Sequence, residues 1–454
     1  MPHAAVTFVL ATHNRGAVVL DTLANLAKVN AAGPDSEVVV VDNASSDGAA
    51  DEIARCHPAV RLVRRSDNRG SCAKAFGVEA ARGEFIVFLD DDSCPRPGSI
   101  GRMIEHFRAD SRLAAAGFSV HLPDGRMESA ALPDVFVGCG VSFRAATLRA
   151  VGGLDAGFFM QAEEYDLAFR LVAAGHRIAV FDDLHVDHLK SPSARCSART
   201  SFYDTRNNLI VAARYLPAPY ERIYRRDWLQ RYRWIAQNEG MESAFWRGAA
   251  LGLMRRDRER RRFCAQRLND AAFDRLFRVG EIDDRMKSLA ERGVRRIALV
   301  SLGKNVYPFV AAARAHGIAI AAIVDDRFAR PGRRYRGVPL VPAGALRRID
   351  IDRLVVADTG PAHAAAARDR LGAVSNRPIE AWFTPSPPPV ANGEMLADAR
   401  RVAGTLVAQL GLLRQTVQDD GLERASNAPR EDRGANRRCD GDRTRDFSRS
   451  GTRV

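Results

Sequence analysis

The chain has 454 residues, of which 46% are hydrophobic and 27% charged, which excludes a fibrous or wholly disordered protein and allows two or three globular domains. Its formal charge of +13 is typical of proteins with an anionic partner, although an arginine-rich proteome would produce the same excess. The seven cysteines are scattered, so we expect no disulfide framework and no zinc site. The N-terminus has no signal-peptide pattern and no run of about 18 apolar residues occurs, so we expect a cytoplasmic protein.

The first 215 residues alternate between short apolar runs and helical patterns. Strands are predicted at 6–11, 37–42, 60–65 and 84–90, and helices at 17–29, 48–56 and 70–81. Continuous apolar strands that alternate with helices are typical of a parallel sheet covered on both faces. In such sheets ligands bind beyond the carboxyl ends of the strands, so the residues after each strand are the first candidates for a site.

The remaining sequence divides into four further segments. Residues 216–293 are dense in arginine with apolar residues at helical spacing, which predicts basic amphipathic helices. Residues 294–390 return to strand–helix alternation and predict a second, smaller α/β domain. A helix is predicted within 391–419. Residues 420–454 are highly charged and almost free of apolar side chains, which indicates disorder.

Polar residues follow all four predicted strands of the first segment. They are Thr12 and Arg15 after the first strand, Asp42 at the end of the second, Asn68 and Arg69 after the third, and Asp90, Asp91 and Asp92 after the fourth. Because the carboxyl ends of parallel strands meet at one edge of a sheet, we expect these side chains to converge.

The three adjacent carboxylates call for a positive partner, since like charges repel and are costly to bury. Oxygen ligands suit a hard divalent cation, Mg²⁺ or Mn²⁺, which would in turn hold a diphosphate. Arg15 and Arg69 add positive charge for the same anion, and Asp42 is suited to a base or ribose. Structural roles without a ligand are the alternatives: the aspartates could form a solvated loop or a helix start, and Arg69 could pair with a surface carboxylate.

Four motifs occur in order within residues 6–215. They are "ATHNR", "VVVDNASSDG", "NRGSCAKAFGVEAARGEFIVFLDDDSCPRPG" and "GCGVSFRAATLRAVGGLDAGFFMQAEEYDLAFRLVAAGH". Together they resemble family 2 glycosyltransferases, in particular rhamnosyltransferases. The resemblance implies a GT-A fold over residues 1–215 and transfer of a sugar, with inversion, from a nucleotide donor such as a UDP- or dTDP-sugar. The implied acceptor is a glycan or lipid-linked glycan in surface polysaccharide or glycoconjugate assembly.

The resemblance also implies roles for individual residues. Those that correspond to nucleotide-binding positions of the family are Thr12, Arg15, Asp42, Asn68 and Arg69. The D-x-D motif falls on Asp90 to Asp92, with Asp90 and Asp91 toward the donor and Asp92 and Asp90 toward the metal. A histidine of "DDLHVDHLKSP" is expected on the metal or diphosphate, His188 first and His185 second, although a structural role is an even alternative. His13 stands where the family commonly has tyrosine, which leaves the base preference open.

The motif "QAEEYDLAFRLVAAGH" supplies the candidate general base. Inverting transfer needs a carboxylate that takes the proton from the attacking hydroxyl. The family's acidic pair falls on Glu163 and Glu164, and we expect Glu164 to be the base, although family members commonly carry Asp there. Asp166 is expected to cap the helix or fix the loop. Upstream, Gly138 and Gly140 would let the backbone approach the donor sugar. Acidic residues at a helix start, favoured by the helix dipole, are the alternative explanation.

The segment from Arg295 to Pro342 resembles the Rossmann-like module of several sugar-modifying proteins. Its glycine fingerprint is reduced to Gly303, and Asp325 and Asp326 stand about 20 positions on, as in a dinucleotide site. A scaffold domain that binds no nucleotide is an equal alternative.

Two other functions are compatible with parts of this sequence. A nucleotidyltransferase also uses carboxylates and Mg²⁺, but "ATHNRGAV" is a poor version of its glycine-rich loop. A nucleic-acid-binding protein could use residues 216–293. We expect no nucleic-acid partner, because the helical spacing there favours packing with a solvated basic face. The same helices could rest peripherally on an anionic membrane.

Overall fold

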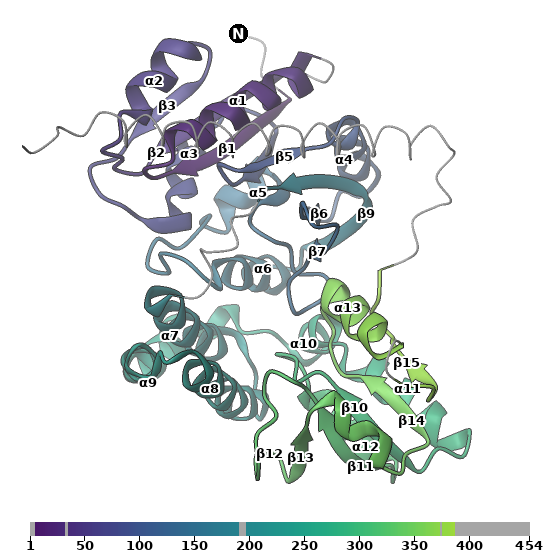
Figure 1. Cartoon of the computed structure of the whole chain (residues 1–454). Coiled ribbons are helices and arrows are strands. Elements are labelled where there is room, and N and C mark those ends of the chain that lie inside the picture. Colours follow the sequence, from purple (N-terminus) through teal and green to yellow (C-terminus); the bar gives the residue numbers. More distant parts are fainter. Residues whose placement is uncertain (1–4, 32–34, 190–196, 373–374, 386–454) are drawn as a thin grey trace, which may run out of the picture. The chain divides into compact units, whose positions relative to one another are not determined.

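The computed structural model describes residues 5–31, 35–189, 197–372 and 375–385 (Figure 1). All of them lie in one structural unit, Met1–Pro388. The helix predicted within 391–419 and the tail 420–454 lie outside the described residues.

A nine-stranded sheet forms the first part of the chain, with strand order β3-β2-β1-β4-β8-β6-β9-β5 and β7 paired to β6. Its strands are β1 (Val6–Thr12), β2 (Ser36–Asp42), β3 (Arg61–Arg64), β4 (Phe85–Leu89), β5 (Ser93–Pro95), β6 (Leu113–His121), β7 (Met127–Glu128), β8 (Gly140–Arg144) and β9 (Arg177–His188). The four strands predicted from apolar runs are β1 to β4, and they pair in parallel. Their carboxyl ends therefore lie at one edge.

The sheet is mixed, whereas the sequence indicated a parallel one. Strand β8 runs antiparallel to both β4 and β6. In this register Leu89, the last residue of β4, lies opposite Gly140, the first residue of β8. Strand β5 pairs antiparallel with β9, and Ser93 lies opposite His188. The antiparallel strands thus bring residues 138–140 and His188 beside the aspartates that follow β4.

Apolar cores cover both faces of this sheet. Along β1, Phe8 and Leu10 belong to one core and Val9 to the other, and Val87 and Phe88 divide in the same way on β4. This two-residue alternation is what a strand buried on both sides requires. The helices of this part are α1 (Gly16–Ala31), α2 (Ala49–Cys56), α3 (Lys74–Ala80), α4 (Ser99–Ala109), α5 (Ala145–Ala150) and α6 (Glu163–Ala173).

The helix predicted over 70–81 begins as a 3₁₀ turn, Gly70–Ala73, which continues into α3. Gly70 has a φ of 62°, and a Cβ there would collide with the backbone oxygen of Phe159. Glycine is therefore required at this position, where the loop before α6 closes on the turn.

Five helices follow the first sheet: α7 (Ala198–Tyr215), α8 (Tyr220–Glu239), α9 (Glu242–Arg262), α10 (Asp270–Phe277) and α11 (Val279–Glu291). Helix α8 ends at Gly240, whose φ of 67° suits a helix C-cap. None of the helices in the described part of the chain has the length and apolar character needed to cross a membrane.

A second, six-stranded sheet follows, with order β12-β13-β11-β10-β14-β15. Its elements are β10 (Arg296–Val300), α12 (Tyr307–Ala315), β11 (Ala319–Val324), β12 (Arg334–Tyr335), β13 (Val338–Val341), β14 (Arg353–Val356), α13 (Pro361–Gly372) and β15 (Ile379–Glu380). All neighbours pair in parallel except β12 and β13. The assignment as a Rossmann-like domain and the boundaries at 215, 293 and 390 stay predictions.

Candidate active site

The residues at the carboxyl ends of β1 and β4 meet at one edge of the first sheet. The Thr12 hydroxyl donates to Asp91 Oδ2 at 2.8 Å, and the Arg15 guanidinium contacts Asp91 Oδ1 at 2.5 Å and Asp92 Oδ2 at 2.8 Å. Thr12, Asp91 and Asp92 are buried. Burial raises the pKa of Asp91 to about 6, although Arg15 opposes this. Asp91 therefore holds the segment from Thr12 to Arg15, at the end of β1, in place.

Asp90 is held by a lysine that the sequence analysis did not single out. Lys74 is buried at the start of α3, and its ammonium group lies 2.5 Å from Asp90 Oδ1 and 2.9 Å from the carbonyl oxygen of Gly138. Lys74 and Arg15 therefore offset much of the repulsion among the three aspartates. The adjacency of the three aspartates therefore does not by itself require a metal ion.

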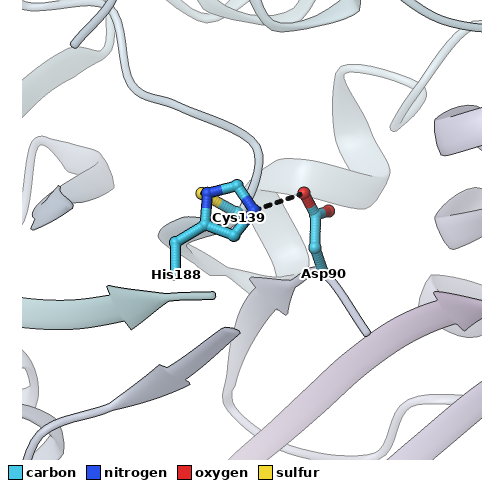
Figure 2. Close-up of side chains that lie close together, drawn as sticks. All are labelled: Asp90, Cys139 and His188. Carbon is cyan, nitrogen blue, oxygen red and sulfur yellow. Dashed lines mark hydrogen bonds and ion pairs between the residues drawn. The ribbon is translucent and has the colours of Figure 1, made fainter. Parts of the chain in front are cut away.

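Three side chains, from the turn after β4, the turn before β8 and the last residue of β9, offer donors to a cation. Asp90, Cys139 and His188 present ligand atoms that all lie within 4.8 Å of one another (Figure 2). His188 Nε2 is 3.9 Å from Asp90 Oδ2 and 3.1 Å from Asp92 Oδ1. Since Lys74 occupies the other oxygen of Asp90, Oδ2 is the one that faces His188. Two carboxylates and an imidazole fit Mn²⁺ or Mg²⁺.

Cys139 orients His188 and is a poor ligand for a hard cation. Its sulfur lies 3.4 Å from His188 Nδ1, and burial raises the pKa of the thiol to about 11, so it stays protonated. His188 Nδ1 also lies 3.2 Å from Glu128 Oε2. With Nδ1 engaged in this way, Nε2 is the nitrogen that remains for a metal.

Proton and metal compete for the same nitrogen. Although burial opposes it, contact with Asp92 raises the pKa of His188 to about 12, and His188 and Arg15 lower the pKa of buried Asp92 to about 2. A cation at Nε2 would displace this proton.

His185 lies away from this cluster. It is three positions before His188 on β9, so its side chain lies on the other side of the strand. Its Nδ1 lies 3.0 Å from His121 Nε2.

The ends of β2 and β3 form a second group beside the first. Asp42 is buried and accepts from the backbone N–H of Ser45 at 3.1 Å. Asn43 bridges the two loops, because its amide donates to Asn68 Oδ1 at 3.0 Å and accepts from the N–H of Arg69 at 2.8 Å. The Arg69 side chain is 46% exposed. It pairs with Asp67 at 2.5 Å, which is the surface pairing considered as its alternative.

The acidic pair stands at the first turn of α6. Glu163 is buried and one of its oxygens accepts from the Ser71 hydroxyl, while its Oε2 has no hydrogen-bond partner in the described part of the chain. Glu164 is partly exposed, and a Cβ added to Gly138 would lie 3.2 Å from its Oε1. Burial raises the pKa of both glutamates, and the negative charge of Glu163 raises that of Glu164 further.

Asp166 is a structural residue and does not cap the helix. It is fully buried and accepts from Arg170, from Arg214 at 2.7 Å and from the Tyr215 hydroxyl at 2.6 Å. Since Arg214 and Tyr215 are on α7, Asp166 ties α6 to α7.

Asn207 of α7 was missed by the sequence analysis. Its Nδ2 lies 3.0, 2.7 and 2.7 Å from the carbonyl oxygens of Phe158, Met160 and Gln161, which form the loop before Glu163. Phe159, Gln161 and Ala162 have φ values of 67°, 68° and 64°, which strain a non-glycine backbone. Asn207 therefore holds a strained loop that places the acidic pair. A pair of asparagines directly before the apolar run 209–213 was the available signal, but the target of Asn207 is not predictable from sequence.

Lys304 brings the loop after β10 to the same region. Its ammonium lies 3.7 Å from the ring centre of Tyr165, the residue after Glu164, and 5.0 Å from that of Trp228. The carboxylates of Asp204 and Glu164 attract this ammonium group, and the guanidinium of Arg231 repels it. Burial lowers the pKa of Lys304 to about 7, although Asp204 opposes this. The second part of the chain thus contributes charge beside the candidate base.

Comparison with known proteins shows which family the part of the chain around the first sheet resembles. Residues 7–130 match the family described as glycosyl transferase family 2. The succinoglycan biosynthesis protein ExoO of Rhizobium meliloti is 37% identical over 126 residues, which cover 27% of this chain and 35% of that protein. The undecaprenyl-phosphate mannosyltransferase of Micrococcus luteus is 31% identical over 181 residues, 34% of this chain and 73% of that protein.

One solved structure similar to the chain is that of the mannosyltransferase PcManGT from Pyrobaculum calidifontis in complex with GDP-Man and Mn²⁺. It is 20% identical, with a TM-score of 0.40 and coverage of 60% of this chain and 87% of that chain. The chain spans about a third of the length of the first curated relatives that it matches, 35% for ExoO. The matched region holds the aspartates after β4, and the longer match covers most of the M. luteus protein. The chain therefore belongs to glycosyl transferase family 2, which confirms the family and the GT-A fold expected from its sequence.

Proposed function

We propose that the chain is an inverting, metal-dependent glycosyltransferase that moves a sugar from a nucleotide-sugar to an acceptor hydroxyl. One observation carries the proposal. Lys74 joins Asp90 to the carbonyl of Gly138, and the other side of Gly138 lies against Glu164 Oε1. The carboxylate cluster suited to a metal diphosphate and the candidate base therefore flank one short stretch of backbone, as transfer to a nearby hydroxyl requires.

Asp90, Asp92 and His188 would hold Mg²⁺ or Mn²⁺, which would supply neutralisation of the donor diphosphate as it leaves. The metal site would be lined on one side by Thr12, Arg15 and Asp91. The nucleotide would be contacted by Asp42, Asn68 and Arg69. The Arg69 side chain is half-exposed, and within the described residues its ion pair is with Asp67, so it is accessible to a nucleotide.

Glu164 would take the proton. As the acceptor oxygen attacks the anomeric carbon, the bond from that carbon to the diphosphate oxygen breaks and the hydroxyl proton passes to the Glu164 carboxylate. A raised pKa makes the carboxylate a stronger base than a solvated glutamate. Glu163 repels negative charge on its neighbour and so favours proton uptake.

The proposed donor is a UDP- or dTDP-sugar, and the proposed acceptor is a glycan or lipid-linked glycan of surface polysaccharide or glycoconjugate assembly. The names of the two relatives, a succinoglycan biosynthesis protein and an undecaprenyl-phosphate mannosyltransferase, support this class of acceptor. We also propose a cytoplasmic location with peripheral membrane contact through the basic helices, and no nucleic-acid partner.

The proposal is tested with a panel of nucleotide-sugars, each incubated with the full chain and Mn²⁺ or Mg²⁺ without acceptor. Many transferases slowly pass the sugar to water, so release of nucleoside diphosphate from one donor, lost on adding EDTA, is the expected result. Release of pyrophosphate from a sugar phosphate and a nucleoside triphosphate would instead identify a nucleotidyltransferase and overturn the proposal.

A further inference from the structure

Helix α9 presents large apolar side chains to solvent. Among the residues that the structure describes, four large hydrophobic side chains are exposed, and three of them are on this helix: Trp246 (56%), Leu253 (40%) and Met254 (81%). Their spacing of seven and eight residues places all three on one face of the helix. Ala250, also exposed, lies between them on that face. Exposed apolar side chains gathered in this way mark an interaction surface.

The opposite face of α9 is made of small residues and is closely packed. A Cβ on Gly248 would lie 2.5 Å from the carbonyl oxygen of Phe202, and one on Gly252 would lie 2.9 Å from Leu209. Ala244 and Ala249 are also buried on this side. Helix α9 thus lies directly against α7, as Figure 1 shows at its left side. This interface has no room for large side chains, so the large apolar residues of α9 lie on its other face.

Ten of the twelve arginines of α8 and α9 fall into two sets. Arg225, Arg256 and Arg260 turn toward Glu221 and contact it at 3.0, 2.9 and 3.4 Å. The second set is exposed and makes no ion pair within the described part of the chain: Arg222, Arg226, Arg233, Arg247, Arg258, Arg261 and Arg262. Arg233 lies over the Trp246 ring, 5.6 Å from its centre, so charge and apolar surface are contiguous.

We propose that the outer face of α9, with Trp246, Leu253 and Met254 at its centre and the unpaired arginines around them, docks on an anionic lipid bilayer. An apolar stripe about the length of two helical turns inside a basic rim is suited to the headgroup boundary, where apolar side chains enter and arginines meet lipid phosphates. A nucleic acid would satisfy the arginines but would leave Leu253 and Met254 in water.

The surface also bears on the proposed function, on which this step rests. Helix α7 lies under α9 and carries Asn207, which holds the loop before the acidic pair. A bilayer at α9 would therefore lie one helix layer, about 10 Å between axes, from the element that supports the base. A lipid-linked acceptor whose chain stays in the bilayer would be presented from this side.

The test uses the full chain and two kinds of vesicle, phosphatidylcholine alone and phosphatidylcholine with about 30% phosphatidylglycerol. Flotation is expected to recover the chain with the anionic vesicles and not with the neutral ones, and less of it at high salt. Brominated lipid is expected to quench tryptophan fluorescence in the wild type. This quenching should be lost in Trp246→Phe, since the other three tryptophans are not on this face.

Two double variants measure the two components of the surface. The apolar component is tested by Leu253→Ser with Met254→Glu, and the basic component by Arg258→Glu with Arg261→Glu. Each double variant is expected to weaken vesicle binding about tenfold or more, at an unchanged melting temperature. The matched control is Arg347→Glu with Arg348→Glu, two exposed arginines of the turn before β14, which should leave binding within about twofold.

Four results would overturn the inference: no binding of the wild type to anionic vesicles, binding that survives both α9 variants, preferential binding to RNA or DNA, or a dimer of the chain that the α9 variants dissociate. Donor hydrolysis without vesicles separates this inference from the proposed function. Hydrolysis without vesicle binding removes the docking surface alone, and vesicle binding without turnover of any donor removes the transferase proposal alone.

Discussion

The two sheets of this chain share a strand–helix pattern, but their carboxyl edges are used in opposite ways. At the first edge, Asp90 Oδ2 and Glu163 Oε2 have no hydrogen-bond donor among the residues that the structure describes, so both oxygens are available to a ligand. At the second, both oxygens of Asp325 are occupied by the chain itself. Oδ2 accepts from the N–H of Leu302 at 2.8 Å, and Oδ1 accepts from the N–H groups of Arg327 and Phe328.

The loop after β10, where a dinucleotide's phosphates would lie, is covered by α8. The Trp228 indole donates to the carbonyl oxygen of Lys304 at 2.9 Å, Arg231 donates to that of Leu302, and the Tyr224 hydroxyl donates to Asn305 at 2.5 Å. The same fold pattern therefore yields one edge suited to ligands and one that packs against other parts of the chain. The pattern predicts where a site can form, and the neighbouring elements decide whether the edge stays open.

The largest expected effect comes from the metal half of the first edge. Asp92→Ala should lower donor turnover by about a thousandfold or more, because the metal contributes several kcal/mol of charge stabilisation. Initial rates against Mn²⁺ concentration measure the loss, and Asp92→Asn, which keeps the side-chain shape, separates lost charge from lost packing. Undiminished turnover of the wild type in excess EDTA would contradict the metal.

Glu164→Gln should lower kcat by at least ~100-fold and leave the donor KM close to that of the wild type, because the amide keeps its size but cannot take a proton. Glu163→Gln is the matched control within the pair, and Asp166→Asn should act on the melting temperature, since Asp166 joins α6 to α7. If Glu163→Gln abolishes turnover while Glu164→Gln does not, the base is Glu163.

The pH dependence follows from the same carboxylate. Burial and the charge of Glu163 raise the pKa of Glu164 from 4.5 to about 8. The base form therefore grows as pH rises, and kcat should climb through neutral pH, reach half its maximum near pH 8 and level off at higher pH. A kcat that is already maximal near pH 5 would show that Glu164 is not the group whose ionisation limits the rate.

A smaller effect is expected at the support of the acidic pair. Asn207→Leu should lower kcat about tenfold with little change in donor KM, because it releases three carbonyl contacts of the strained loop. Asn208→Leu is the control, since Asn208 is buried on the same helix but bonds to Asp204 and Tyr232. Equal kcat losses in the two variants would indicate damage to α7 in general.

The smallest effect on activity is expected at the second edge. Asp325→Ala should reduce stability by about 1–3 kcal/mol, because the buried loop loses its acceptor, yet change the donor KM by less than about twofold. Thermal unfolding and donor kinetics measure the two. A large rise in donor KM at an unchanged melting temperature would show that the second edge binds nucleotide, and the contrast between the sheets would fail.

The sequence by itself determined the first four strands, their common edge and the polar residues on it, because apolar runs and strand–helix alternation are local signals with one topological outcome. It also determined the family, since four motifs in order are specific. Tertiary structure alone decided which residues meet. Thr12 and Asp91 are 79 residues apart, and Lys74 and Gly138 are 64 apart.

The same limit explains the details that the sequence left open. His185 and His188 looked alike, and the pairing of β9 with β5 decided that His188 faces Asp92. The helical spacing of apolar residues on α9 indicated an amphipathic helix. Only the packing of Gly248 and Gly252 against α7 showed that the face with small residues is buried and the face with large apolar residues is exposed. Periodicity specifies that a helix or strand has two faces. Which face is covered, and by what, depends on contacts between segments far apart in the chain.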